Sequence, residues 1–163
     1  NSKRGGKMDN PNVPIVVLPG GMMPARQTEG AVGFDVYIRA IVDSDTNQWD
    51  PEYPYLRKTR FDFKKIPQDN YAWNVRQISG ENGGTELVYR MEPGESVLVG
   101  LGFITEMPFP MFYDVRPRGG LTAKGIVITN AASPVDPDYR GESGIMIENR
   151  SKDFFVLFAF QTT

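Results

Sequence analysis

The sequence predicts a single all-β domain, of the kind found in sandwiches, barrels and jelly rolls. Two observations favour this class. Short runs of apolar or alternating residues recur along the chain, and 17 glycines and 13 prolines scattered over its 163 residues separate those runs. The chain is too short for two domains of ordinary size. An α+β fold would need helix start signals, which the sequence lacks.

Each run predicts one strand, because side chains that alternate along a strand face a core on one side only. Residues 13–18 (VPIVVL) and 33–42 (GFDVYIRAIV) are the first two. A glycine-containing run at 95–104 (ESVLVGLGFI) and a short one at 112–116 (FYDVR) follow. The last three are 125–129 (GIVIT), 143–148 (SGIMIE) and 153–160 (DFFVLFAF).

Residues 43–86 differ in texture from the rest, being rich in Asp, Asn, Lys, Arg, Tyr and Trp. RFDFKKI and YAWNVRQI predict strands, and SGENGGTE predicts a glycine-rich turn. We interpret the segment as an inserted β-hairpin excursion of the same domain, solvated on one face and packed on the parent sheet with the other. The alternative is a platform for nucleic acid, which stacks bases on aromatic side chains.

Composition restricts the chemistry. A formal charge of −2 leaves no basic excess for a polynucleotide, so we expect no nucleic-acid partner. Neither cysteine nor histidine is present, so carboxylates, arginines and backbone amides must carry any reaction. The lack of cysteine and of long apolar runs favours a soluble cytoplasmic protein without a membrane partner. We expect residues 1–7 to be a tag remnant or disordered arm, with one domain over 8–163.

Three stretches depart from what a strand-and-turn scaffold needs. Asp35 enters an otherwise apolar strand, which calls for a partner, either in a structural ion pair with an arginine or in a functional site. Arg118 precedes Gly119 and Gly120, where backbone amides can approach an anion without a helix, although such a sequence also occurs in ordinary loops.

The third stretch is SPVDPDYRGE, which puts charge and turn-forming residues between two predicted core strands. In an extended segment Asp136 and Asp138 point to one side and Tyr139 points to the other. An Asx-type turn with a solvent-facing tyrosine is the alternative. The anion loop at Arg118, only 18 positions before Asp136, favours a functional interpretation.

These stretches together resemble a known family. MPARQTEGAVGFDVYI, MEPGESVLVGLGFITEMPFPMFYDVRPRGGLTAKGI and TNAASPVDPDYRGESGIMIENRSKDF are similar, in this order, to the first three motif regions of the trimeric dUTP pyrophosphatases, or dUTPases. The match covers residues 23–40 and 89–155, about half of the chain. The resemblance implies a jelly-roll β trimer that splits dUTP into dUMP and pyrophosphate, with Mg²⁺ on the phosphates and active sites at subunit interfaces.

The resemblance also implies roles for residues. Asp136 matches the carboxylate that orients the attacking water. Tyr139 matches the ring beneath the deoxyribose, where it leaves no room for a 2′-hydroxyl. Asn130 takes the position that hydrogen-bonds the uracil edge. Arg118 and Gly120 match residues of the phosphate loop, and Asp35 matches the acidic residue that supports the metal and phosphates through water.

Two positions depart from the family pattern. Gly119 replaces a serine that contacts the oxygen between the α and β phosphates, and a lost hydrogen bond to a charged group costs about 1.5–3 kcal/mol, or about ten- to a few hundredfold in rate. The fourth motif is reduced to Gln161 as a remnant. The alternatives are a non-catalytic or weakly active dUTPase-like nucleotide-binding trimer and a relative of the dCTP deaminases.

Overall fold

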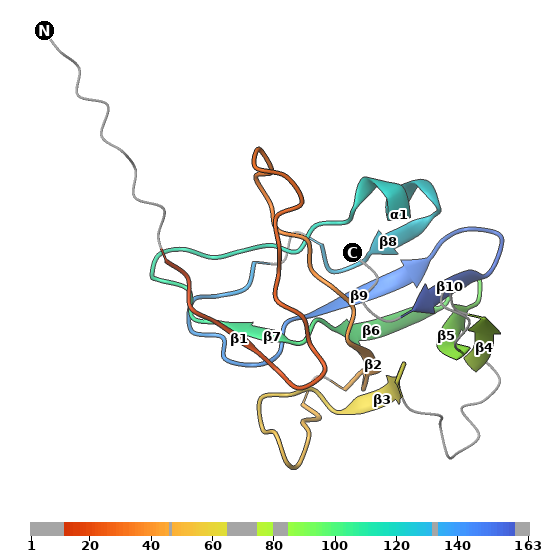
Figure 1. Cartoon of the computed structure of the whole chain (residues 1–163), viewed down its shortest axis with the longest axis horizontal. Coiled ribbons are helices and arrows are strands. Elements are labelled where there is room, and N and C mark those ends of the chain that lie inside the picture. The colour runs from red at the N-terminus through yellow and green to blue at the C-terminus, as the bar shows by residue number, and fades with distance from the viewer. Residues whose placement is uncertain (1–11, 46, 65–74, 80–84, 132–133, 159–163) are drawn as a thin grey trace, which may run out of the picture.

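The computed structural model describes residues 12–45, 47–64, 75–79, 85–131 and 134–158. These residues form β-strands joined by turns, with one short helix (Figure 1). The elements are β1 (Ile15–Val17), β2 (Ala40–Val42), β3 (Thr59–Asp62), β4 (Val75–Ser79), β5 (Thr85–Met91), β6 (Ser96–Gly100), β7 (Phe103–Thr105), α1 (Gly119–Ala123), β8 (Ile126–Ile128), β9 (Gly144–Asn149) and β10 (Phe155–Phe158). The predicted all-β class is confirmed.

The strands form three antiparallel sheets. The largest has the order β3-β2-β6-β9-β8, the second has the order β10-β5-β4, and β1 pairs with β7. In Figure 1 the β1–β7 pair lies at one end of the molecule and the β4–β5–β10 sheet at the other. Strands far apart in sequence are neighbours in the large sheet, with Ser96 of β6 opposite Glu148 of β9.

Alternation along the strands builds the core. In β9, Ile145, Ile147 and Asn149 are buried, while the residues between them are partly exposed. A strand with this pattern is stable only with one face against other apolar residues. The main core cluster joins residues from all three sheets: Ile38, Ile41, Phe61, Phe63, Met91, Val97, Val99, Leu101, Phe103, Ile126, Ile145, Ile147 and Leu157.

The predicted strand at 95–104 is in fact two strands. Gly102 lies between β6 and β7 with φ of 69°, a conformation that glycine adopts without strain. Gly21 passes so close that a Cβ there would lie 2.7 Å from the carbonyl carbon of Gly102. The Leu18 N–H also donates to the Gly102 carbonyl at 2.9 Å. The bend therefore redirects the chain from the large sheet into the β1–β7 pair.

Two other predicted strands are shorter than expected. Of residues 33–42 only β2 is a strand, and Asp35 makes an isolated bridge with Ala25. Residues 112–116 contain a single bridge, Tyr113 with Val135, rather than a strand. That bridge brings the stretch before Arg118 next to the stretch before Asp136.

The segment 43–86 does not form one excursion. β3 lies at the edge of the large sheet, whereas β4 pairs with β5 in the second sheet as the predicted hairpin. Phe61 and Phe63 of the first part are buried and meet edge to face at 4.9 Å. Residues 43–64 therefore contribute buried aromatic side chains to the core.

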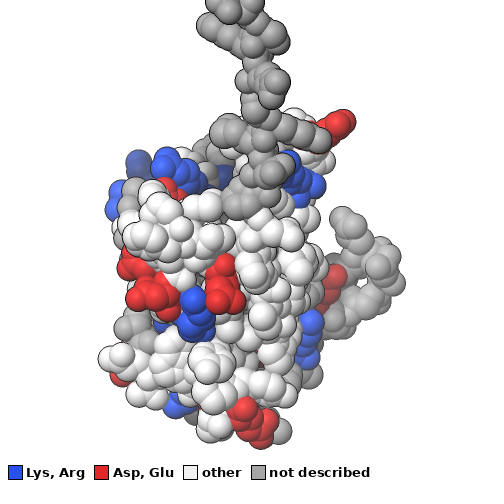
Figure 2. Space-filling view, turned by 90° about the vertical axis from the view of Figure 1, so that its left-hand side faces the viewer, with Lys and Arg blue, Asp and Glu red and all other residues white. Residues whose placement is uncertain are grey.

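On the face seen in Figure 2, the described residues form no continuous basic area. Their acidic and basic side chains occur there in small separate groups among uncharged ones. Within those residues, the model contains no helix of the length and apolar character that a membrane crossing requires. The predicted arm at 1–7 lies outside the described residues.

Candidate functional site

Asp35 and Arg118, from the first and second motif stretches, form an ion pair. Arg118 Nη1 lies 3.1 Å from Asp35 Oδ2, and the arginine side chain is 49% exposed. Asp35 is held by two backbone hydrogen bonds to Ala25, at 2.8 and 3.1 Å. Ion pairs this exposed contribute little to stability, about 0–1 kcal/mol. The pair therefore gives the Asp35 carboxylate a counter-charge, although Asp35 Oδ2 accepts no hydrogen bond from the described residues, and it leaves the guanidinium accessible to an anion.

Gly119 and Gly120 form the first turn of α1, so the prediction of an anion loop without a helix is wrong. The N–H groups of Leu121 and Thr122 donate to the Arg118 carbonyl at 3.0 and 3.1 Å, and these bonds close the turn. A Cβ added at either glycine would meet no atom within 4 Å. The space beside this turn is thus open to another molecule.

Asn130 lies in the connection that follows β8. Its side-chain oxygen accepts a hydrogen bond from the Met146 N–H of β9 at 2.9 Å. This oxygen is already used to hold the two strands together. A bound base would therefore have to be read by the Asn130 amide nitrogen or by neighbouring backbone groups.

Asp136 and Tyr139 line one cavity of about 450 Å³. The Tyr139 N–H donates to the Asp136 carbonyl at 3.1 Å, which makes residues 136–139 a turn. Of the two alternatives from the sequence, this bond favours a turn over an extended segment, and Tyr139 in that turn is half-buried rather than solvent-facing. The complete lining is Trp49, Pro54, Tyr55, Asp136, Asp138, Tyr139, Arg140 and Gly141.

The hydroxyl of Tyr139 is held on both sides. It accepts a hydrogen bond from Arg57 Nη2 at 3.0 Å and donates one to the Glu142 carbonyl at 3.2 Å. Burial raises the pKa of Tyr139, and the positive charge of Arg57 opposes that rise. The phenol is therefore neutral at physiological pH and fixed in orientation.

Glu142 anchors this turn to the core. Its carboxylate is completely buried and accepts hydrogen bonds from Arg39 Nε at 2.8 Å, Arg39 Nη2 at 2.9 Å, and the N–H groups of Arg57 and Gly102, each at 2.8 Å. A buried carboxylate is tolerated only with such partners. The turn after Tyr139 thus has a fixed position relative to β2, β3 and the Gly102 bend.

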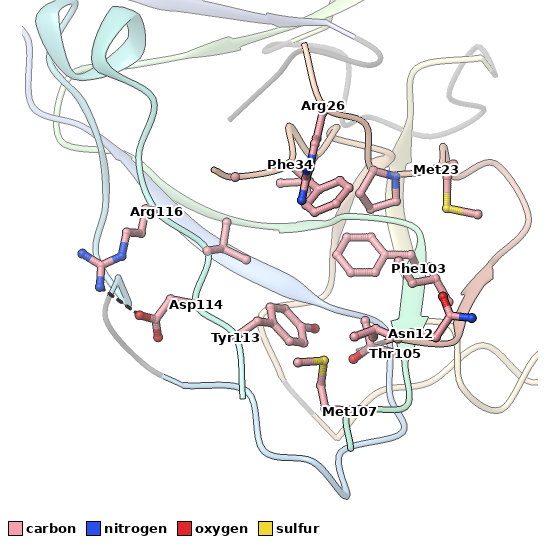
Figure 3. Close-up of a pocket in the computed structure, with 16 residues that line it drawn as sticks. Asn12, Met23, Arg26, Phe34, Phe103, Thr105, Met107, Tyr113, Asp114 and Arg116 are labelled. Atoms are coloured by element: carbon pink, nitrogen blue, oxygen red, sulfur yellow. Dashed lines mark hydrogen bonds and ion pairs between the residues drawn. The ribbon is translucent and has the colours of Figure 1, made fainter. Parts of the chain in front are cut away.

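A larger cavity of about 650 Å³ lies beside the first two motif stretches. Figure 3 shows Phe34, Phe103 and Tyr113 converging on it, with Arg26 beside Phe34. The Arg26 guanidinium lies 4.9 Å from the Phe34 ring centre. Tyr113 contacts the Ser143 hydroxyl, and burial raises the Tyr113 pKa. Phe34 is 55% exposed, so this cavity presents an apolar rim to solvent.

The structure brings the predicted site residues into two groups. Asp35 pairs with Arg118, and Asp136 shares a cavity with Tyr139. Neither Asp35 nor Arg118 lines that cavity. Gln161 lies outside the described residues.

The sequence reasoning missed three residues of this site, Trp49, Tyr55 and Arg57. Trp49 and Tyr55 line the cavity of Asp136, and Arg57 binds Tyr139. The aromatic and basic texture of residues 43–86 was the signal that could have found them. It was assigned instead to a hairpin solvated on one face and packed on the parent sheet with the other.

Comparison with known proteins decides the family. No protein-family model matches the chain. The deoxyuridine 5′-triphosphate nucleotidohydrolase of Heliobacterium modesticaldum is 31% identical over 152 residues, which are 88% of this chain and 74% of that protein. The chain belongs to the dUTPase family. The corresponding protein of Agrobacterium fabrum is 43% identical over 68 residues, which are 41% of this chain and only 44% of that relative.

A solved dUTPase has the same fold. The structure of a mutant dUTPase from phage phi11 of S. aureus, described with a structural Mg(II) ion, matches with a TM-score of 0.54 over 93% of this chain and 77% of that chain. Its sequence identity is 14%, so the likeness concerns the fold alone. The predicted dUTPase-like jelly-roll class is thereby confirmed.

Proposed function

We propose that this dUTPase-family chain hydrolyses dUTP to dUMP and pyrophosphate. The observation that carries the proposal is the alignment with the Heliobacterium nucleotidohydrolase over 88% of the chain. The geometry is compatible with it, because a carboxylate and a fixed tyrosine share one open cavity. In-line displacement at phosphorus requires mainly positioning and charge neutralisation, so the lack of histidine is no obstacle.

In the proposed reaction, Asp136 accepts a hydrogen bond from water and directs the water oxygen at the α-phosphorus, and the water proton passes to the Asp136 carboxylate as the oxygen attacks. The new P–O bond forms as the bond to the α,β-bridging oxygen breaks, and pyrophosphate leaves with that oxygen. Tyr139 abuts the deoxyribose, and Asn130 with nearby backbone reads the uracil edge. Arg118, Gly119 and Gly120 hold the phosphates, and Gln161, as a remnant of the fourth motif, also binds the substrate.

Magnesium fits this arrangement as a companion of the substrate phosphates. Within the part of the chain that the structure describes, no three or more Asp or Glu side chains are arranged so that they could hold a metal ion by themselves. Mg²⁺ bound to phosphates keeps several waters and needs only one or two carboxylates. Asp35, 22% exposed beside Arg118, can reach such a hydrated ion through water. The ion would supply charge neutralisation on the phosphates.

We further propose that the active unit is a homotrimer with shared sites. The two groups of site residues lie in different places on one chain, and an active site at a subunit interface would unite Asp136 of one copy with Arg118 of a neighbour. Exposed apolar side chains support association, among them Val32 at 97% and Phe109 at 88% exposure.

Incubation with dUTP and Mg²⁺, with release of pyrophosphate as the readout, tests the activity. UTP and dCTP serve as controls, and ammonia release from dCTP would indicate a deaminase instead. Hydrolysis of dUTP alone is expected. Binding without turnover would contradict the proposal.

The role of Asp136 has its own test. Asp136→Asn should abolish turnover and leave dUTP binding intact, because the amide is a poor acceptor for the water proton. The matched control is Asp153→Asn, at an exposed position near β10, which should keep full activity. Equal turnover in Asp136→Asn and wild type would refute the assignment.

A further inference from the structure

Residues 49–57 form a closed loop against the proposed substrate cavity. Trp49 and Arg57 bridge its two ends, and the Asp50 N–H donates to the Leu56 carbonyl at 2.8 Å. Leu56 is only 5% exposed, and the Asp50 carboxylate accepts the N–H of Tyr53 at 3.1 Å. A loop with these internal bonds and a buried anchor presents its side chains in fixed positions.

Arg57 connects this loop to the turn that carries Tyr139. Its backbone N–H donates to the Glu142 carboxylate at 2.8 Å, and its Nε donates to the Glu142 carbonyl at 3.1 Å. Its Nη2 donates to the Tyr139 hydroxyl at 3.0 Å. Because the guanidinium is a planar fork, two contacts to one turn fix its plane, and with it the hydroxyl of the ring.

Trp49 and the Tyr139 hydroxyl both border the space beside Gly141. A Cβ at Gly141 would lie 2.6 Å from the Tyr139 hydroxyl oxygen and closer still to the Trp49 indole. The indole thus fills the space that a side chain at position 141 would take. The Arg57 guanidinium lies 5.4 Å from the Trp49 ring centre, so Trp49 contacts the arginine that binds the Tyr139 hydroxyl.

From this geometry we infer that Arg57 and Trp49 are positioning residues that hold the Tyr139 ring and so set the preference for deoxyribose over ribose. The inference rests on the proposed function. Exclusion of a 2′-hydroxyl by an abutting ring works only when the ring cannot yield. A tyrosine that loses its hydrogen bond from Arg57, or whose Arg57 loses the contact with Trp49, can rotate away and admit the additional hydroxyl.

The test compares kcat/KM for dUTP and UTP in Arg57→Met, Tyr139→Phe and the double variant. Arg57→Met should raise kcat/KM for UTP by about tenfold, the effect of one charged hydrogen bond, and leave kcat for dUTP within about threefold. Tyr139→Phe should likewise raise the ratio of kcat/KM for UTP to that for dUTP, and the double variant should raise this ratio little further, because both changes remove one interaction. Trp49→Leu should act in the same direction. The control, Lys58→Met, removes a neighbouring exposed charge and should change neither substrate.

A higher kcat/KM for UTP distinguishes a positioning role from general damage to the fold. A misfolded protein would lose activity on UTP and on dUTP in the same proportion. An unchanged UTP rate with normal dUTP turnover in Arg57→Met would overturn the inference, and so would proportional loss of both in a folded protein. Where Arg57→Met fails to fold, Arg57→Lys decides by the same criteria, because an ammonium cannot serve both acceptors in one plane. A wild-type protein that leaves dUTP intact would overturn the proposed function itself, a result distinct from an unchanged preference.

Discussion

Glu142→Gln should destabilise the protein strongly while changing only one group. The carboxylate is 0% exposed and the Arg39 side chain 7%, and the neutral amide leaves the Arg39 charge buried without a counterion. The amide NH₂ also faces donors, because Arg57 N–H and Gly102 N–H both point at this carboxylate. Removing one partner of a buried pair costs about 3–5 kcal/mol. That is a large share of the roughly 5–15 kcal/mol by which a domain is stable.

Urea unfolding followed by tryptophan fluorescence, at one protein concentration, measures the loss in free energy of unfolding, and a thermal scan of the same samples measures the melting temperature. The melting temperature should fall by about 6–20 °C, at about 2–4 °C per kcal/mol for a chain of this size. The control is Glu148→Gln. Its partner Arg150 lies 3.2 Å away but is 61% exposed, so the cost should stay below about 1 kcal/mol.

The double variant Arg39→Met with Glu142→Gln tests the reason for the loss. With both charges gone, the remaining deficit should be about 1–3 kcal/mol, from imperfectly satisfied N–H groups. The double variant should therefore be more stable than Glu142→Gln alone. A single-variant cost below about 1 kcal/mol, or a double-variant cost equal to the sum of the two singles, would refute this account of the pair.

Three further predictions concern the site. Gly119→Ser should fold normally, because its Cβ meets no atom within 4 Å, and should raise the dUTP turnover number by about tenfold or more; an unchanged rate would count against the placement of this loop. Gly141→Ala should lower the urea midpoint and weaken the preference for dUTP over UTP, since the new methyl collides with Trp49 and Tyr139; wild-type values for both would contradict the packing described. Burial raises the pKa of Tyr139 above its ordinary 10.0, so its contribution to stability is complete below that pH and lost as pH rises through the raised value. Between about pH 8 and 11 the urea midpoint should thus fall less in Tyr139→Phe than in wild type. An equal fall in both proteins would contradict the raised pKa of Tyr139.

Local patterns predicted the strands whose burial alternates, and the structure shows why others were missed. β9 was evident because Ile145 and Ile147 alternate with partly exposed residues. The break at Gly102 was not evident, since a glycine within an apolar run is compatible with a straight strand until Gly21 is known to press against it. At Asp136 the sequence left a turn and an extended segment as alternatives, because a periodic pattern cannot reveal the single backbone hydrogen bond that closes the turn.

The site residues likewise fall into those that the sequence indicated and those that only the structure reveals. The motif stretches indicated Asp136, Tyr139 and Arg118 because resemblance is carried by contiguous residues. The role of Arg57 could not be predicted from a contiguous motif, because its contact with Tyr139 joins residues 82 positions apart in the sequence. The need for glycine at 141 likewise arises from an indole in a segment that the family resemblance does not cover.

The crossing of Gly21 and Gly102 limits how this protein can change. At each position the nearest obstructing atoms are main-chain atoms of the other glycine. A larger residue at one position therefore cannot be compensated by a smaller residue at the other, because that residue is already glycine. A second-site suppressor would have to move the backbone around Gly21 or Gly102 as a whole, so that the two segments no longer approach so closely. Selection for revertants should therefore return the original glycine far more often than a compensating change.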